Sequence, residues 1–148
     1  MSNANELILD IAQTARNGCI CLDLQRAARA IARRFDAAFR PLDLTNGQFS
    51  LLMSLKHRGP SQMGQVAALL AVDRTTLTAA LKPLARRGLV KVAVNPADRR
   101  GRQLMLTPEG RRLLATARPI WQREHEMIDR LVLPPGPENL RSVLRALS

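Results

Sequence analysis

Residues that cross-link chains or bind metals are scarce in this 148-residue sequence, and their scarcity excludes two classes of protein. The only cysteines, Cys19 and Cys21, are too few to staple a small secreted domain together. The two histidines, His57 and His125, lie far apart and give no metal-ligand spacing. We therefore expect neither a disulfide framework nor a metal or other cofactor.

The sequence also lacks long apolar runs and a targeting segment. No run approaches the ~18 apolar residues that a membrane span needs. The N-terminal segment MSNANELILD has neither the basic start nor the long apolar core of a signal peptide. We therefore expect a cytoplasmic protein with no membrane partner.

Motifs of enzyme chemistry are missing as well. The spacing brings together no Ser/His/Asp or Cys/His set, no glycine-rich phosphate loop occurs, and no helical face carries paired carboxylates. His57 and His125 are each expected at the surface. Tyrosine is absent, and only three Phe and one Trp are present, so aromatic residues give no hint of a ligand pocket. The sequence argues against an enzyme.

Arginine is what the sequence has in excess. Of 23 basic residues 20 are Arg and 3 are Lys, against 12 acidic residues, and the net charge is +11. Ten basic residues and only two acidic ones lie between Arg74 and Arg112. Because guanidinium groups make forked contacts with phosphate and guanine, nucleic acid is the leading partner class. The alternative is a generally cationic surface that serves only solubility.

The stretch NPADRRGRQLMLTPEG, residues 95–110, concentrates this charge in one loop. Its arginines surround a turn-forming Asn-Pro and a glycine, between an apolar run at Leu89–Val94 and an alternating segment at Gln103–Leu106. Close arginines repel one another unless an anion lies opposite, and the single Asp98 is too little to neutralise them. The loop is therefore predicted to meet a polyanion, the alternative being a merely solvated turn.

Hydrophobic periodicity predicts a mainly helical chain that is interrupted once by a short pair of strands. Helices are expected over about residues 21–39, 45–56, 62–70, 74–87, 108–131 and 138–147, and strands over 89–94 and 102–106. The residues expected to cap helix starts are Thr45 with Gln48, Ser61, Asp73, and Thr107 followed by Pro108. The segment His57–Pro60 is expected to end the second helix.

Two short helices joined by a tight turn at Ala71-Val72, followed by a basic two-stranded ribbon, predict a winged helix-turn-helix, an α+β element in a mainly α chain. In the second helix the residues expected to face the core are Leu77, Ala80, Leu81 and Leu84. The other residues of the helix are free to contact bases and phosphates through hydroxyl, methyl or cationic groups. They are Arg74, Thr75, Thr76, Thr78, Ala79, Lys82 and Arg86. Pro83 is expected to bend this helix.

Two motifs, DRTTLTAALKPLARRGLV at 73–90 and DRRGRQLMLTPEG at 98–110, resemble the recognition helix and the Asp-x-Arg wing of the MarR family of bacterial and archaeal transcription regulators. The resemblance extends from about Cys21 to Leu147. It implies one chain, 1–148, with a DNA-binding lobe at 44–107 and a helical dimerisation region at 1–43 and 108–148. It also implies an obligate homodimer on double-stranded DNA that is regulated by a small ligand or an oxidant.

The resemblance gives the wing residues separate roles. Arg100 is the expected minor-groove residue, and Asp98 is its orienting partner. Arg99 and Arg102 are expected to grip flanking phosphates. Ser61, at the start of the first helix of the motif, completes the predicted DNA-binding set.

The last predicted helix carries an apolar stripe at i, i+3, i+4 and i+7, which needs a partner surface. The stripe consists of Leu140, Val143, Leu144 and Leu147. The resemblance implies that a second copy of the chain covers it.

The segment NGCICLDLQ at 17–25 offers a possible redox site. Asn17 is expected to cap the helix that follows, which would put Cys19 and Cys21 near its first turn, where backbone N–H groups favour a thiolate. A disulfide between them is not expected, because side chains two residues apart on a helix point to nearly opposite sides.

By resemblance, Cys21 falls where the organic hydroperoxide regulators of the family carry their reactive cysteine. Those members orient the thiolate with tyrosines, which this chain lacks. Cys21 also shares an apolar stripe with Leu24, Ala28 and Ile31, so the alternative is a packing cysteine at a dimer interface.

Three functional hypotheses remain open at this stage. The first is a sequence-specific, ligand- or oxidant-responsive DNA-binding dimer that acts as a repressor on a pseudo-palindromic operator. The second is a non-specific architectural nucleic-acid-binding protein, and the third is a winged-helix protein-interaction module. Site preference and the salt dependence of DNA binding separate them.

Overall fold

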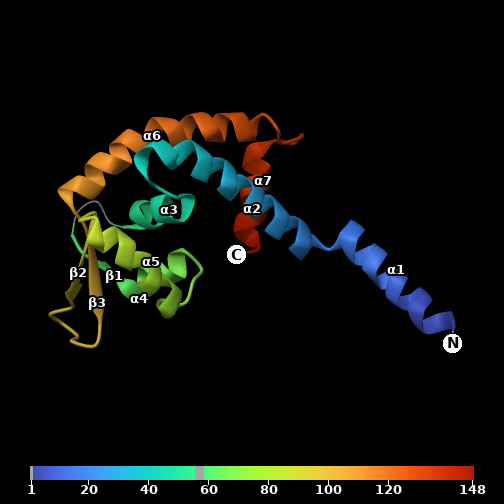
Figure 1. The fold of residues 1–148 in the computed structure, drawn as a ribbon, viewed down its shortest axis with the longest axis horizontal. Helices are drawn as coiled ribbons and strands as arrows, with labels where there is room; N and C mark the ends of the chain where they lie inside the picture. Colours follow the sequence, from blue (N-terminus) through green and yellow to red (C-terminus); the bar gives the residue numbers. More distant parts are fainter. Residues whose placement is uncertain (1, 56–58) are drawn as a thin grey trace. The chain divides into compact units, whose positions relative to one another are not determined.

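The computed structural model describes residues 2–55 and 59–148, and these residues fall into two compact units that divide between Arg34 and Phe35. Figure 1 shows their helices and the small sheet. No helix in the described part of the chain is long and apolar enough to cross a membrane.

The described residues of the first unit are helical except Cys19. Helix α1 spans Ser2–Gly18, and α2 begins at Ile20 and continues to Phe39 in the second unit. The sequence did not predict α1. Asn17 lies inside α1, so its expected capping role is wrong. Cys19 alone separates the two helices, with its N–H donating to the Ala15 carbonyl at 3.2 Å.

The second unit contains the remaining elements. They are the 3-10 helix η1 (Arg40–Leu42), α3 (Asn46–Ser54), β1 (Ser61–Gln62), α4 (Met63–Leu69), α5 (Arg74–Arg86), β2 (Val90–Val94), β3 (Arg102–Leu106), α6 (Pro108–Asp129) and α7 (Pro137–Ala146). The expected helix end at Lys56 and the beginning of the stop at His57 lie outside the described residues. The mainly helical chain with a winged helix-turn-helix is confirmed.

The three strands form one antiparallel sheet in the order β1-β3-β2. In the ribbon formed by β2 and β3, Val90 pairs with Leu106 and Val94 with Arg102. Ser61 lies in β1 and pairs with Leu104 of β3, so its expected role as a helix cap is wrong, and α4 begins only at Met63. Pairing with a distant strand fixes the Ser61 backbone in place of the local cap.

Three other predicted caps are confirmed, and each fixes the start of a helix. Thr45 and Gln48 form a reciprocal capping box at the start of α3. Asp73 Oδ1 accepts from the Thr76 N–H at 2.6 Å at the start of α5. Thr107 Oγ1 accepts from the Gly110 N–H at 3.0 Å at the start of α6. Each bond satisfies a backbone donor that the helix itself leaves unpaired.

The core of the second unit lies beneath α5 and the sheet. Leu77, Leu81 and Leu84 of α5 are buried there as predicted, whereas Ala80 is exposed and its predicted place in the core is wrong. His125 is half-buried rather than at the surface, because its ring packs on Trp121 with a centroid distance of 4.3 Å.

Candidate nucleic-acid interface

Helix α5 presents one face to the core and leaves the other free. All seven of its predicted contact residues are exposed: Arg74, Thr75, Thr76, Thr78, Ala79, Lys82 and Arg86. Gly88, at a φ of 68°, ends the helix in the left-handed conformation and turns the chain into β2. Because Leu77, Leu81 and Leu84 are buried, α5 is held against the core and its polar face stays exposed.

Two of the threonine hydroxyls on this face have partners within the protein. The Thr78 hydroxyl donates to the Arg74 carbonyl at 2.7 Å. Thr76 hydrogen-bonds through its backbone and its side chain to Asp73, and the backbone bond is the main cause that lowers the pKa of this carboxyl. With their protons engaged in this way, Thr76 and Thr78 offer a lone pair and a methyl group to a base edge.

A polar cleft of about 200 Å³ separates the start of α5 from the wing. Arg74, Arg100 and Arg102 all line it. Gly64 of α4 leaves room for this arrangement, since a Cβ at that position would lie 3.3 Å from Arg74 Nη2. Three guanidinium groups around one cleft suit a phosphate of a nucleic-acid backbone.

The wing turn between β2 and β3 is organised by its own polar groups. Asn95 and Gly101 pair across the turn, with a backbone bond from the Asn95 N–H to the Gly101 carbonyl at 3.1 Å. Asn95 Oδ1 also accepts from the Ala97 N–H at 3.0 Å and from Gln103 Nε2 at 3.1 Å. The Asn-Pro pair predicts a turn, but it does not predict the hydrogen bonds that the Asn95 side chain makes within it.

Asp98 fixes the backbone of Arg100 rather than its guanidinium. Its carboxylate accepts from the Arg100 N–H at 3.0 Å. Arg102 Nη1 donates to the Gly101 carbonyl at 3.2 Å. The side chains of Arg99 and Arg100 make no hydrogen bond or ion pair to any described residue. The wing therefore has a rigid backbone and carries two unneutralised cations.

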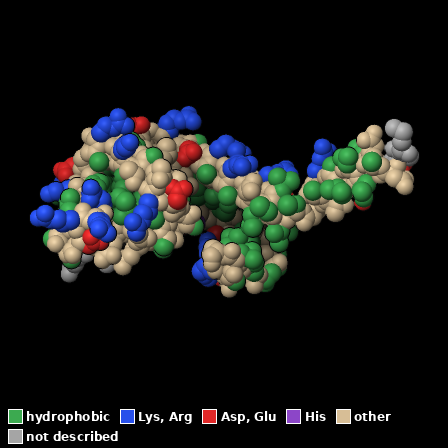
Figure 2. Space-filling model, turned by 90° about the horizontal axis from the view of Figure 1, so that it is seen from below, with side chains coloured by type: hydrophobic (Ala, Val, Ile, Leu, Met, Phe, Trp, Pro, Cys, Tyr) green, Lys and Arg blue, Asp and Glu red, His purple; other side chains and the backbone are tan. Residues whose placement is uncertain are grey.

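Figure 2 shows basic side chains spread over the visible face of the molecule, with fewer acidic side chains among them. The side chains of Arg74, Lys82 and Arg86 likewise make no hydrogen bond or ion pair to any described residue. Ser61 is different, because it is 2% exposed and offers no surface to a ligand. Ser61 is therefore not part of this exposed basic face.

The apolar stripe on α7 is uncovered in the single chain. Leu140 is 42% exposed, Val143 48%, Leu144 39% and Leu147 61%. Helix α7 is attached to α6 through Arg141, whose guanidinium lies 2.5 Å from Asp129 Oδ1 and 2.7 Å from Glu138 Oε1. The stripe is thus held on a fixed helix.

The two cysteines lie at the junction of α1 and α2. Cys19 is half-buried and Cys21, the second residue of α2, is exposed. Gln25 Nε2 donates to Cys21 Sγ at 3.3 Å. Because Cys19 lies outside both helices, the two side chains are not held apart by one continuous helix, which weakens the sequence argument against a disulfide.

A protein-family model and a curated protein both match this chain. A model described as "MarR family" matches residues 44–101. The HTH-type transcriptional regulator PecS of Dickeya dadantii is 30% identical over 152 residues, which covers 95% of this chain and 89% of PecS.

Two solved structures also resemble the chain. The Mycobacterium tuberculosis transcriptional regulator MosR in complex with DNA is 36% identical, with a TM-score of 0.79 and coverage of 87% of this chain and 92% of that one. Bordetella bronchiseptica BpsR, described as regulated in DNA binding by 6-hydroxynicotinic acid, is 26% identical, with a TM-score of 0.77 and coverage of 86% and 91%.

Proposed function

Because this chain belongs to the MarR family of transcription regulators, we propose that it represses transcription by binding a pseudo-palindromic operator in double-stranded DNA as a homodimer. The named relatives are regulators, and this chain is a regulator rather than an enzyme. We place the DNA-binding lobe at 44–107 and the dimerisation region at 1–43 and 108–148.

One observation carries the proposal: α5 and the wing together present five cations without a polar partner among the described residues. They are Arg74, Lys82, Arg86, Arg99 and Arg100. Leaving so many close cations unpaired is unfavourable unless a polyanion lies opposite. Arg74 and Arg102 line the cleft between α5 and the wing. This cleft is suited to a phosphate of the DNA that the five cations would meet.

The two elements have different tasks in this proposal. Helix α5 lies in the major groove, where Thr75, Thr76, Thr78 and Ala79 contact base edges and set the preferred sequence. The wing lies along the adjacent minor groove, with Arg100 inserted and with Arg99 and Arg102 on flanking phosphates. Asp98 takes no part in DNA contact, because it holds the Arg100 backbone.

The α7 stripe supports the homodimer. Four large apolar side chains in one row are unfavourable in water, and a two-fold partner presents the same row in return. With two lobes related by this symmetry, the recognition helices lie about 34 Å apart, one turn of DNA.

A small amphipathic anion is the proposed effector. A pocket of about 490 Å³ between α3 and α6 has an apolar lining that includes Phe49, Leu114 and Trp121. Arg118 also lines it and makes no hydrogen bond or ion pair to any described residue, so it can bind a carboxylate. The regulation of BpsR by an aromatic acid supports this class of ligand.

The alternative effector is an oxidant that acts on Cys21 with Cys19. Exposure of Cys21 in the first turn of α2 supports it. Mild organic peroxide should then release wild-type protein from DNA and leave Cys21→Ser bound. If aromatic acids release both proteins while peroxide releases neither, the cysteines are structural. In that case Arg118→Ala should abolish the response to the acid.

Capture of genomic DNA tests the proposed function as a whole. Purified protein is mixed with fragmented genomic DNA, and the retained fragments are sequenced. A regulator should enrich few fragments that share a pseudo-palindrome. Uniform retention would indicate an architectural protein, and retention without steep salt dependence would favour a protein-interaction module.

A further inference from the structure

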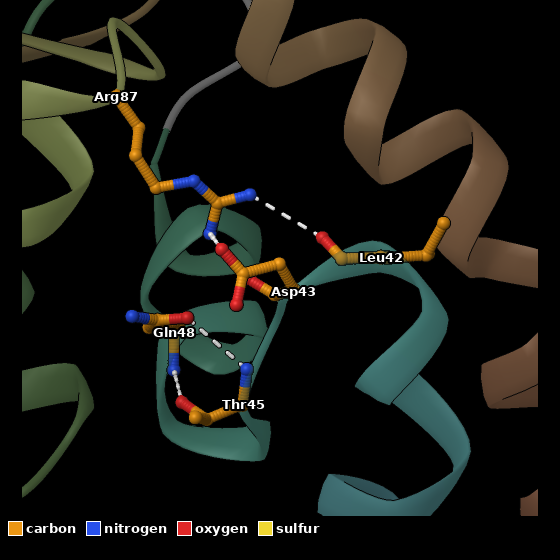
Figure 3. Close-up of polar contacts among 5 residues, drawn as sticks. All are labelled: Leu42, Asp43, Thr45, Gln48 and Arg87. Atoms are coloured by element: carbon orange, nitrogen blue, oxygen red, sulfur yellow. Dashed lines mark hydrogen bonds and ion pairs between the residues drawn. The ribbon is translucent and has the colours of Figure 1, made fainter.

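Arg87 connects the end of the recognition helix to the segment between α2 and α3. It is the C-cap residue of α5. Its Nη1 donates to the Asp43 carbonyl, and its Nη2 donates to the Leu42 carbonyl at 3.3 Å (Figure 3). The partners are 44 and 45 residues apart in sequence, so the contact joins two distant parts of the unit.

The segment that accepts these bonds is itself firmly held. Asp43 has a φ of 49°, and its N–H donates to the Arg40 carbonyl at 3.0 Å. Asp36, in the last turn of α2, accepts from the Asn46 N–H at 2.7 Å. The capping box at the start of α3 follows directly (Figure 3). The two carbonyls are therefore fixed to the end of α2 and to the start of α3.

Arg87, which donates these two bonds, is tied through the backbone to α5 and to the end of the wing. The Arg87 N–H donates to the Pro83 carbonyl at 3.1 Å, within α5. The carbonyl of the next residue, Gly88, accepts from Thr107 Oγ1 at 2.6 Å, just after β3. A displacement of Arg87 would therefore displace both the recognition helix and the wing.

The two carbonyls, rather than the Asp43 carboxylate, are the main partners of Arg87. The carboxylate lies 4.0 Å from Nη1, and the Asp43 side chain is 96% exposed. The planar guanidinium can donate to two acceptors at once in a fixed geometry, whereas a lysine ammonium carries the same charge at a single point. The contact therefore requires the forked pair of N–H donors of a guanidinium, called here the guanidinium fork, and not only a positive charge.

We propose that Arg87 is a positioning residue for DNA recognition, whose guanidinium fork sets α5 and the wing against the end of α2. The inference rests on the proposed function, because it concerns how the DNA-facing elements are held. Arg87 is assigned no DNA contact of its own, because Nη1 and Nη2 are both directed at the two carbonyls. These bonds use two of about five N–H donors of a guanidinium, so the salt slope of Arg87→Gln tests whether the others reach a phosphate. A small shift of α5 would misplace the base-reading threonines while leaving the cations able to bind phosphates.

Two substitutions test the proposal, because Arg87→Lys keeps the charge and loses the fork whereas Arg87→Gln loses both. Arg87→Lys and Arg87→Gln are compared with wild type for affinity to a captured genomic site and to a scrambled duplex, over a range of salt concentrations. Both variants should bind the captured site about tenfold more weakly and the scrambled duplex as wild type does. Their salt slopes should be unchanged. Asp43→Asn, which keeps the carbonyl, and Arg112→Lys, at a residue paired with Glu109 outside the interface, serve as matched controls.

Each outcome is decisive. If Arg87→Lys keeps wild-type site affinity, the fork is not needed and the inference is wrong. A salt slope lowered by about one in Arg87→Gln alone would make Arg87 a phosphate contact, which also overturns it. Circular dichroism and melting curves exclude unfolding as the cause; if Arg87→Lys is unfolded at the assay temperature, Arg87→Gln decides. A wild-type protein without site preference would defeat the proposed function, and this inference with it.

Discussion

At the scale of single residues, hydrogen bonds hold the backbone of the wing turn, while the Arg99 and Arg100 side chains make no polar contact with any described residue. The Asp98 carboxylate fixes the Arg100 N–H, so the backbone of the turn is ordered before any ligand arrives. The Arg100 guanidinium has no partner among the described residues. Because the turn is already ordered, its backbone loses little conformational entropy on binding DNA.

Substitution of Arg100 should therefore weaken DNA binding without changing the preferred sequence. In Arg100→Ala we expect lower affinity for specific and scrambled duplexes alike, and a salt slope reduced by about one, because the minor groove loses one cation that displaces counterions from the DNA. Fluorescence anisotropy at several salt concentrations measures both quantities. Arg112→Ala, which removes a cation paired with Glu109, is the control. Unchanged binding by Arg100→Ala would remove the wing from the mechanism.

At the scale of elements, the caps determine where the DNA-facing helices begin. Thr45, Asp73 and Thr107 could be predicted because a helix start is a local problem, solved by a side chain within three residues of the donor that it satisfies. The orientation of α5 follows from its leucines, which were also visible in the sequence. The prediction that Ala80 faces the core is wrong, because an alanine side chain is small enough to lie on either the buried or the exposed face of a helix.

The elements that the sequence did not predict depend on long-range contacts. Strand β1 is two residues long and exists through pairing with Leu104 and Gln103, so Ser61 gave only its local capping signal. The Arg87 contact likewise joins residues more than forty positions apart. Helix α1 is the exception, because Leu7, Ile8 and Ile11 recur at helical spacing and would have indicated it without any long-range contact.

The cap at Asp73 makes the stability of α5 dependent on pH. The Thr76 N–H holds the pKa of Asp73 below its usual value of 3.8, so the folded protein favours the carboxylate. This contribution is present above pH ~3.8 and is lost as the pH falls through the lower folded pKa. Asp73→Asn should unfold at lower urea than wild type at pH 7, and the difference should shrink in acid. A difference that grows in acid would contradict the account.

Gly110 marks a close approach between α6 and the sheet. A Cβ at this position would lie 2.3 Å from the Leu89 carbonyl oxygen and 2.8 Å from Leu106 Cδ1. Gly110→Ala should therefore lower the free energy of unfolding by about 1–3 kcal/mol, as overpacked sites do. Gly47→Ala in α3, where no heavy atom lies within 4 Å of the added Cβ, is the control and should be neutral or slightly stabilising. Equal stability of both variants would refute the packing argument.

At the scale of the whole molecule, the α7 stripe predicts a dimer. Light scattering at micromolar concentration should give twice the chain mass for wild type. Leu144→Glu should give the monomer mass, because it puts a charge into the row of apolar side chains. Ser142→Glu places the same charge on α7 away from the stripe and should remain dimeric. A monomeric wild type would defeat the dimer proposal.

The central claim, that this chain recognises a DNA sequence rather than DNA in general, is tested most directly by one ratio. The dissociation constant for the captured genomic site is measured against that for a scrambled duplex of the same composition, at physiological salt. The account predicts a preference of about 10³-fold or more for a site whose two half-sites lie one helical turn apart. A ratio within about tenfold would contradict it and leave a non-specific cationic protein.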